Sequence, residues 1–284
     1  MSEQNRTILL VGTSGTGKTH YGGQLLIRLN EGEGDLKMKG VPENVTPYEE
    51  AERKLGQGVL SGHTSEGTYR ESVFPVESKN AKSSNLVWPD YAGEQISQMV
   101  ELRRVNKSWL RRLLESEGWM LFIRLDNIRV YEDMLSRPTG QKGKTAKEGE
   151  NLEFSWSSQA IYVELIQLLL FTKGVGTISR VTSPALTILL TCWDEMDEAS
   201  HQVSPAVVLR EKMPLFADFL RSTWHPDKLS IYGLSALGKS LKKDEPDPEY
   251  LEHGPEAFGY IVLPDGARDP DLTLPVSRLM EQVT

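Results

Sequence analysis

The chain has 284 residues, a length that suits one large domain or two small ones and allows a sizeable buried core. Its net charge of −8 argues against a constitutive nucleic-acid binder and against docking on an anionic membrane, because both need a basic surface. A single cysteine, Cys192, excludes a disulfide framework and a thiolate zinc cluster. The first residues lack an apolar signal core and no apolar run is long enough for a bilayer, so we expect a cytoplasmic protein.

The first third of the chain predicts a strand, two helices and a hairpin. The apolar run at 7–12 is typical of a buried strand, and helical pattern follows over 17–30. The segment 46–55 begins with Thr-Pro-x-Glu, which predicts a helix with the threonine as N-cap. A polar turn joins the strands predicted at 68–77 and 85–90, and so short a connection makes the pair antiparallel.

The rest of the chain alternates helices with strands. We predict helices over 96–117, 157–171 and 214–224, and strands over 119–125, 185–193, 229–234 and 260–266. The Gly/Lys-rich segment 136–153 is a predicted mobile insertion. Because the apolar strands are continuous, they indicate an α/β fold with a mainly parallel sheet covered on both faces, to which the hairpin adds one antiparallel edge.

The sequence "GTSGTGKT" lies between the first strand and the first helix, which is the setting of a phosphate-binding loop. Glycines let backbone N–H groups surround phosphate oxygens, and the helix start adds partial positive charge. Lys18 would reach the outer phosphates, and the Thr19 hydroxyl would bind Mg²⁺. The candidate nucleotide-binding residues of this loop are Gly12, Thr13, Ser14, Gly15, Thr16, Gly17, Lys18 and Thr19.

A second match, "GLSALGKS", also follows a predicted strand. The segment after it contains two prolines and a cluster of charges, which disfavour the helix that a phosphate-binding loop needs. We therefore do not interpret Gly238, Lys239 and Ser240 as a second phosphate site. The residues just before them, Ser235 and Ala236, have the local form of a guanine-binding loop instead.

Two further strand ends carry candidate site residues. Asp90 can bind Mg²⁺ through water, and Gly93, three residues on, offers a backbone N–H to a γ-phosphate. After Thr191, Asp194 can accept hydrogen bonds from the N1–H and exocyclic amine of guanine, a donor pair that adenine lacks. The Ala236 N–H would lie near the guanine oxygen.

The order GTSGTGKT, DYAG, TCWD and SAL resembles the Ras-like, translation-factor-related P-loop GTPases, the TRAFAC class. The "DYAGEQ" element and the tail "FGYIVLPDGARDPDL" also resemble the double-GTPase-like proteins of bacterial conflict systems. The resemblance implies a three-layer G domain over 1–284. Its expected insertions lie near 31–67, as the switch I region, 136–153 and 241–272.

The resemblance also implies a Mg²⁺-dependent GTPase that switches between GTP and GDP states. It assigns Lys18 and Thr19 to phosphates and Mg²⁺, Asp90 to a Mg²⁺ water, Gly93 to the γ-phosphate, and Thr191, Asp194, Ser235, Ala236 and Leu237 to the base. Either Thr64 or Thr68 would be the switch I threonine that binds the metal. The candidates for catalysis are Glu94, Lys18 and Thr64, and a protein effector or activator would bind the switch regions.

Three residues depart from the family pattern. Cys192 replaces a lysine that packs along the base, and Leu237 replaces a second lysine. Glu94 replaces the glutamine that orients water, and its charge near the γ-phosphate predicts slow hydrolysis.

Other interpretations stay open at this stage. Asp194 can be a helix-entry cap, and Glu94 an ordinary charge at a helix N-terminus. Arg103, Lys107 and Arg111 form a basic stripe on the predicted helix, either a solvated face or a partner surface. The rival functions are an ATP-using P-loop enzyme, either an ATPase or a kinase, and a nucleotide-bound scaffold that does not hydrolyse.

Overall fold

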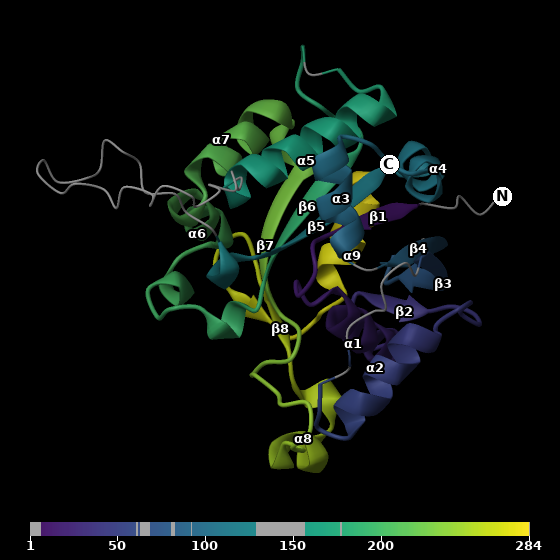
Figure 1. Ribbon diagram of the computed structural model, residues 1–284. Helices are drawn as coiled ribbons and strands as arrows, with labels where there is room; N and C mark the ends of the chain where they lie inside the picture. The colour runs from purple at the N-terminus through teal and green to yellow at the C-terminus, as the bar shows by residue number, and fades with distance from the viewer. Residues whose placement is uncertain are drawn as a thin grey trace, which may run out of the picture.

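A computed structural model describes most of the chain (Figure 1). It covers residues 7–60, 62, 69–80, 83–91, 93–128, 157–176 and 178–283. Thr64, Thr68 and the predicted insertion at 136–153 lie outside these residues, as does the side chain of Asp90. Within the described ranges, no helix is both long and apolar enough to cross a membrane.

The main sheet has six strands in the order β1-β5-β6-β7-β8-β9. Their bounds are β1 Ile8–Val11, β5 Gly118–Arg124, β6 Ala185–Thr191, β7 Leu229–Ser235, β8 Tyr260–Val262 and β9 Arg268–Asp269. The first four pair in parallel, and β8 and β9 add an antiparallel edge. This mostly parallel sheet with one antiparallel edge confirms the α/β fold class predicted from the sequence.

The hairpin belongs to a second sheet, which corrects its predicted place as the antiparallel edge of the main one. This sheet has the order β2-β3-β4, with bounds β2 Leu36–Met38, β3 Tyr69–Ser78 and β4 Ser83–Tyr91. The antiparallel pairing of β3 and β4 is confirmed, and β2 extends the pair because Leu36–Met38 lies in register with Val76–Ser78. β4 lies next to β1, so the end of β4 reaches the loop after β1.

Helices cover both faces of the main sheet (Figure 1). The bounds of the described helices are α1 Lys18–Glu31, α2 Thr46–Gly56, α3 Glu94–Leu102, α4 Lys107–Glu115, α5 Ser158–Lys173, α6 Pro205–Lys212, α7 Pro214–Thr223, α8 Pro248–His253 and α9 Leu274–Gln282. Of these, α2 packs on α1, and α8 lies away from the sheet, near α2 (Figure 1). The sequence prediction omitted α6 and α9. It also assigned the segment containing α8 to a loop, whereas Asp247 caps a short helix there.

The single helix predicted over 96–117 is wrong, because the structure breaks it into α3 and α4. Arg103 adopts a left-handed conformation with φ 48°, and the Asn106 side chain then caps α4 by accepting the Trp109 N–H at 3.1 Å. The basic stripe therefore does not lie on one helix. Arg103 pairs with Glu164 at 2.8 Å, and Arg111 lies 3.6 Å from Glu71.

Part of the expected switch I region is packed structure, since β2 and α2 lie within it. α2 starts one residue earlier than predicted: Val45 is its N-cap and Thr46 its first residue, with no side-chain cap bond. Two adjacent glycines on α1 let α2 approach closely, because a Cβ on Gly22 would lie 2.4 Å from the Tyr48 ring. Tyr48 is almost fully buried as a result.

Two buried clusters on opposite faces of the main sheet make the three layers. On β5, Trp119, Leu121 and Ile123 belong to the cluster under α3, α5 and α7, whereas Met120 and Phe122 belong to the cluster under α1 and α9. Each such side chain contributes roughly 1.5–3 kcal/mol through burial. Because parallel strands end at one edge, this arrangement brings the loops after β1, β5, β6 and β7 together.

Candidate functional site

The loop between β1 and α1 has the geometry expected of a phosphate-binding loop. Gly15 and Gly17 adopt φ values of 76° and 77°, which side chains disfavour, and no other heavy atom approaches where their Cβ atoms would lie. The Thr16 hydroxyl donates to the Thr13 carbonyl at 2.9 Å and closes the turn. The loop is therefore a preformed backbone concavity that opens onto a cavity.

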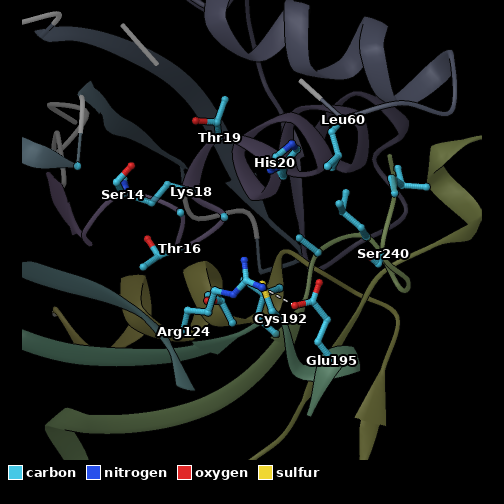
Figure 2. A pocket seen from close by; sticks show the side chains of 18 of the residues that line it. Ser14, Thr16, Lys18, Thr19, His20, Leu60, Arg124, Cys192, Glu195 and Ser240 are labelled. Atoms are coloured by element: carbon cyan, nitrogen blue, oxygen red, sulfur yellow. Dashed lines mark hydrogen bonds and ion pairs between the residues drawn. The ribbon is translucent and has the colours of Figure 1, made fainter. Parts of the chain in front are cut away.

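The Lys18 ammonium lies over this loop. Its Nζ donates to the carbonyls of Gly12 at 2.9 Å and Thr13 at 2.8 Å, and it lies 5.2 Å from the centre of the Tyr91 ring. Thr19 follows in the first turn of α1, and both side chains face the cavity. Figure 2 shows Ser14, Thr16, Lys18 and Thr19 grouped on one side of it.

Gly93 packs directly on the loop from the start of α3. A Cβ on Gly93 would lie 2.0 Å from the Ser14 nitrogen and 2.4 Å from the Thr13 carbonyl carbon, so only glycine fits. Glu94, the first residue of α3, lines the cavity and carries a charge that suits the helix N-terminus. The structure therefore joins the residues just after β4 to the loop after β1.

Tyr91 is a site residue that the sequence prediction missed. Its buried hydroxyl accepts the Gly12 N–H at 2.8 Å and donates to the Leu10 carbonyl at 3.0 Å. Its ring meets Trp109 edge to face, with centroids 4.5 Å apart. The tyrosine thus fixes the point where β1 turns into the loop, and no local sequence pattern could reveal this contact across the fold.

The opposite end of the cavity is made by the loops after β6 and β7. The Thr191 hydroxyl donates to the Ile123 carbonyl at 3.2 Å, and the chain then turns through Cys192 at φ 54°. The Ser235 hydroxyl donates to Asp194 Oδ1 at 2.5 Å and accepts the Gly238 N–H at 2.9 Å. Among the described residues, none donates a hydrogen bond to Asp194 Oδ2.

One cavity of about 220 Å³ connects the two ends. The predicted site residues that line it are Ser14, Gly15, Thr16, Gly17, Lys18, Thr19, Gly93, Glu94, Thr191, Asp194, Ala236 and Leu237. Gly12, Thr13 and Ser235 support it from behind through the hydrogen bonds above. Of Asp90, the structure describes the backbone at the end of β4, in register with Arg70.

The second "GKS" match lies beside this cavity and does not form a separate phosphate site. Lys239 Nζ pairs with Asp247 at 2.8 Å and with Glu249 at 2.7 Å, and the chain after Ser240 is not helical. Lys239 and Ser240 line the same cavity as the first loop. The structure thus agrees with the sequence interpretation, which denied this match the role of a second phosphate-binding loop.

Arg124 is a second lining residue that the sequence prediction missed. It ends β5 opposite Thr191, and its guanidinium binds Asp126 and Glu195. Cys192 lies beside it, and burial raises the pKa of that thiol to about 12, so the sulfur is uncharged at neutral pH. In Figure 2, Arg124, Cys192 and Glu195 lie across the cavity from the first loop.

Comparison with known proteins identifies the family. No curated protein sequence matches the chain. The Ski7 GTPase-like domain of S. cerevisiae, solved with GDP and inorganic phosphate, is 17% identical with a TM-score of 0.43, over 87% of this chain and 47% of that one. The signal recognition particle receptor SRb-GTP/SRX complex from Chaetomium thermophilum is 14% identical with a TM-score of 0.41, over 84% and 94% of the two chains. This chain thus spans about half the length of the Ski7 chain.

A family profile gives the stronger result. The profile described as Double-GTPase 1 matches residues 9–279, from the first strand of the main sheet into the last helix. The match includes the loop after β1, the end of β4 and the loops after β6 and β7. The chain therefore belongs to the Double-GTPase 1 family.

Proposed function

We propose that this chain is a single G domain with insertions near 31–67, 136–153 and 241–272. It binds Mg²⁺·GTP, hydrolyses it slowly to GDP and acts as a nucleotide-dependent switch. The observation that carries the proposal is one continuous cavity with Lys18 and Thr19 at one end and Asp194 at the other. Membership of a GTPase family supports the same function.

The loop at 12–19 would hold the phosphates. Its left-handed glycines turn backbone N–H groups toward the cavity, and the N-terminus of α1 adds partial positive charge. The Lys18 ammonium now rests on the Gly12 and Thr13 carbonyls, from which it can turn to the outer phosphate oxygens. Gly93 is close enough to this loop for its N–H to serve the γ-phosphate.

The metal would be Mg²⁺, held by Thr19, by Asp90 through water and by Thr64 or Thr68. Hydroxyl, carboxylate and phosphate oxygens are the hard donors that this ion prefers. Phosphate oxygens of the nucleotide would supply further ligands. When bound, the ion would neutralise negative charge on the β- and γ-phosphates.

The guanine would bind at Asp194. Ser235 holds Oδ1, and the carboxylate can still accept the N1–H and the exocyclic amine of guanine. The backbone N–H of Ala236 would serve the guanine oxygen, with Leu237 beside it and Thr191 behind. Adenine offers no matching donor pair, so this end of the cavity supports selection of GTP over ATP.

Glu94 would act on the attacking water. Its carboxylate lies at the cavity next to Gly93, where it can orient water but also repels the γ-phosphate. We therefore propose that the chain alone hydrolyses GTP slowly. An arginine of a protein activator would increase this rate by roughly 10³–10⁵-fold. Effector or activator binding would use the switch regions, near 31–67 and 91–105.

The test of the base assignment is Asp194→Asn, assayed with GTP, ATP and xanthosine triphosphate. We expect GTP affinity to fall roughly 100-fold and xanthosine triphosphate affinity to rise, because the substituted amide can pair with the extra oxygen of xanthine. Asp197→Asn is the matched control, because Asp197 lies three residues away and outside the cavity lining. This variant should change neither the GTP affinity nor the xanthosine triphosphate affinity. A preference of the unaltered protein for ATP would instead support the ATP-using enzyme.

Hydrolysis is tested by single-turnover release of phosphate from GTP, with and without Mg²⁺. We expect slow release of phosphate that requires Mg²⁺. We also expect the rate of this release to differ between Glu94→Gln and the unaltered chain. If GTP binds tightly but the rate of phosphate release depends neither on Mg²⁺ nor on Glu94, the site does not catalyse hydrolysis. That result would support the non-hydrolysing scaffold. The double-GTPase resemblance further leads us to propose a role in bacterial defence, testable by comparing phage challenge of cells carrying the native chain or Lys18→Ala.

A further inference from the structure

Cys192 leaves one wall of the base site without the lysine that related GTPases have there. Cys192 has a short side chain and adopts a left-handed backbone conformation with φ 54°, and its thiol, whose pKa burial raises, carries no charge at neutral pH. A cysteine cannot cover a purine face as the aliphatic part of a lysine does. Another side chain must therefore pack along the base if this site is to hold it firmly.

Arg124 is the side chain next to this gap. β5 and β6 pair in parallel with Arg124 opposite Thr191, so its side chain starts level with the residue before Cys192. It lines the same cavity as Cys192 and Asp194. Figure 2 shows its guanidinium beside Cys192 and Glu195, extended toward the middle of the cavity.

The guanidinium is fixed in place by two carboxylates. Nε donates to Asp126 at 2.8 Å, and Nη2 donates to Glu195 at 2.5 Å. The side chain keeps 28% of its surface exposed. Its orientation is therefore set before a nucleotide arrives, and only a small loss of side-chain entropy opposes binding.

Charge indicates that this arginine serves the base rather than the phosphates. Asp126 and Glu195 together outweigh its single positive charge, so this group of three has a net negative charge and repels a triphosphate. A planar guanidinium still stacks well on an aromatic face, which a lysine ammonium does not. The phosphates already have Lys18 and the helix N-terminus on the other side of the cavity.

We propose that Arg124 is a base-binding residue of this site and that its guanidinium plane stacks on the purine, in place of the lysine replaced by Cys192. The proposal rests on the nucleotide-binding function proposed above. It adds a contact that is independent of the number of phosphates. Arg124 thus supports affinity, and Asp194 supports selection of guanine.

The experiment measures GDP and GTP affinity by displacement of a fluorescent guanine nucleotide, for the full chain and three variants. Arg124→Leu removes the guanidinium, and Arg124→Lys keeps the charge but removes the plane. Arg221→Leu is the matched control, because Arg221 is an exposed arginine that pairs with Asp218 on α7, outside this cavity. Thermal unfolding without nucleotide checks that each variant folds.

We expect Arg124→Leu to bind GDP and GTP about 5- to 30-fold more weakly, with the same factor for both, as a stacked cation predicts. Arg124→Lys should bind more weakly than the unaltered chain but no more weakly than the leucine variant, because its aliphatic part can cover the purine whereas its ammonium does not stack. Arg221→Leu should match the unaltered chain. Full affinity in Arg124→Leu or Arg124→Lys, or a loss larger for GTP than for GDP, would overturn the stacking proposal alone. Failure of the unaltered chain to bind guanine nucleotides would instead overturn the proposed function.

Discussion

At the end of the cavity that we propose to bind phosphates, hereafter the phosphate end, the close packing involves the backbone of the loop at 12–19. At the end that we propose to bind guanine, hereafter the base end, side chains pair with one another. Gly93 lies against the Ser14 backbone, and Tyr91 bonds the Gly12 N–H, so a substitution there moves the loop itself. Across the cavity, Arg124 is held by Glu195 and Asp194 by Ser235. A substitution at the phosphate end therefore disturbs packed backbone, whereas one at the base end removes a side-chain pair.

Residues 241–258 pack on the loop after β7 from outside the cavity. Leu55 at the end of α2, Leu241 and Tyr250 form a small separate buried cluster. The Tyr250 ring stacks on Phe258 with centroids 4.1 Å apart, and its hydroxyl donates to the Leu237 carbonyl. The loop after β7 is thus supported by residues 241–258, which lie outside the motifs.

The largest expected effect separates the two lysines that follow Gly-rich turns. Lys18→Ala removes the charged donor to the outer phosphates, and we expect GTP affinity to fall by about 100-fold or more. Lys239→Ala only releases Asp247 and Glu249, so its affinity should stay within about threefold. Equilibrium titration with GTP checks both, and an equal loss in the two variants would mean that the second loop also grips phosphate.

The next effect tests the close packing at the phosphate end. Gly93→Ala places a methyl group on the Ser14 backbone, and we expect the free energy of unfolding to drop by about 1–3 kcal/mol together with GTP hydrolysis. Gly56→Ala is the matched control, since its added methyl group would meet nothing within 4 Å. Urea unfolding measures both variants. Equal stability of Gly93→Ala and the unaltered chain would show that the loop shifts to accommodate the methyl group without cost.

A smaller effect is expected from Tyr91→Phe. The change leaves the buried Gly12 N–H and Leu10 carbonyl without their partner, which costs about 1–3 kcal/mol of unfolding free energy. Nucleotide affinity should fall as well, because the start of the loop loses its anchor. Urea unfolding and GTP titration measure the two effects, and a variant as stable as the original would show that the hydroxyl bond is dispensable.

The smallest effect is a local response to acid at two carboxylates in the chain that follows β6 and β7, outside the cavity lining. Hydrogen bonds from Lys212 and Lys239, respectively, lower the pKa values of Asp197 and Asp247 below their usual range. Carboxyls with lowered pKa values add stability above about pH 4, and that stability is lost as pH falls through the lowered values. The protection factors for hydrogen exchange, which correct for slower intrinsic exchange in acid, should therefore fall around 197–200 and 239–250 before they fall in the loop at 12–19.

If residues 197–200, 239–250 and the loop at 12–19 all lost protection at the same pH, the predicted difference in acid response would be contradicted. Asp197→Asn provides the internal control, because it removes the titrating group and should flatten the response at 197–200 alone.

Most of the phosphate end could be predicted from the sequence because its signals are local. A strand, a Gly-rich loop and a helix follow one another directly, and Asp90 and Gly93 stand three residues apart. The sequence also predicted parallel strands before Asp194 and before Ala236. Because parallel strands end at one edge of the sheet, both residues line one cavity. These features depend on chain order and on the parallel sheet, both of which the apolar runs indicate.

The residues that the prediction missed act across the fold. Tyr91 meets Gly12 only after β4 lies next to β1, and Arg124 meets Glu195 only through the pairing of β5 with β6. The break between α3 and α4 was missed because a left-handed arginine at position 103 has no strong sequence signal. Such contacts depend on tertiary packing, which overrides local propensity.

The central claim is that one cavity grips a triphosphate with the loop at 12–19 and reads guanine with Asp194. Equilibrium competition between GTP and ATP for the unaltered protein, with Mg²⁺ present, tests it most directly. The account predicts that GTP binds at least about 100-fold more tightly, since adenine leaves the Asp194 carboxylate without the two donors that guanine offers. Equal affinities, or a preference for ATP, would contradict it.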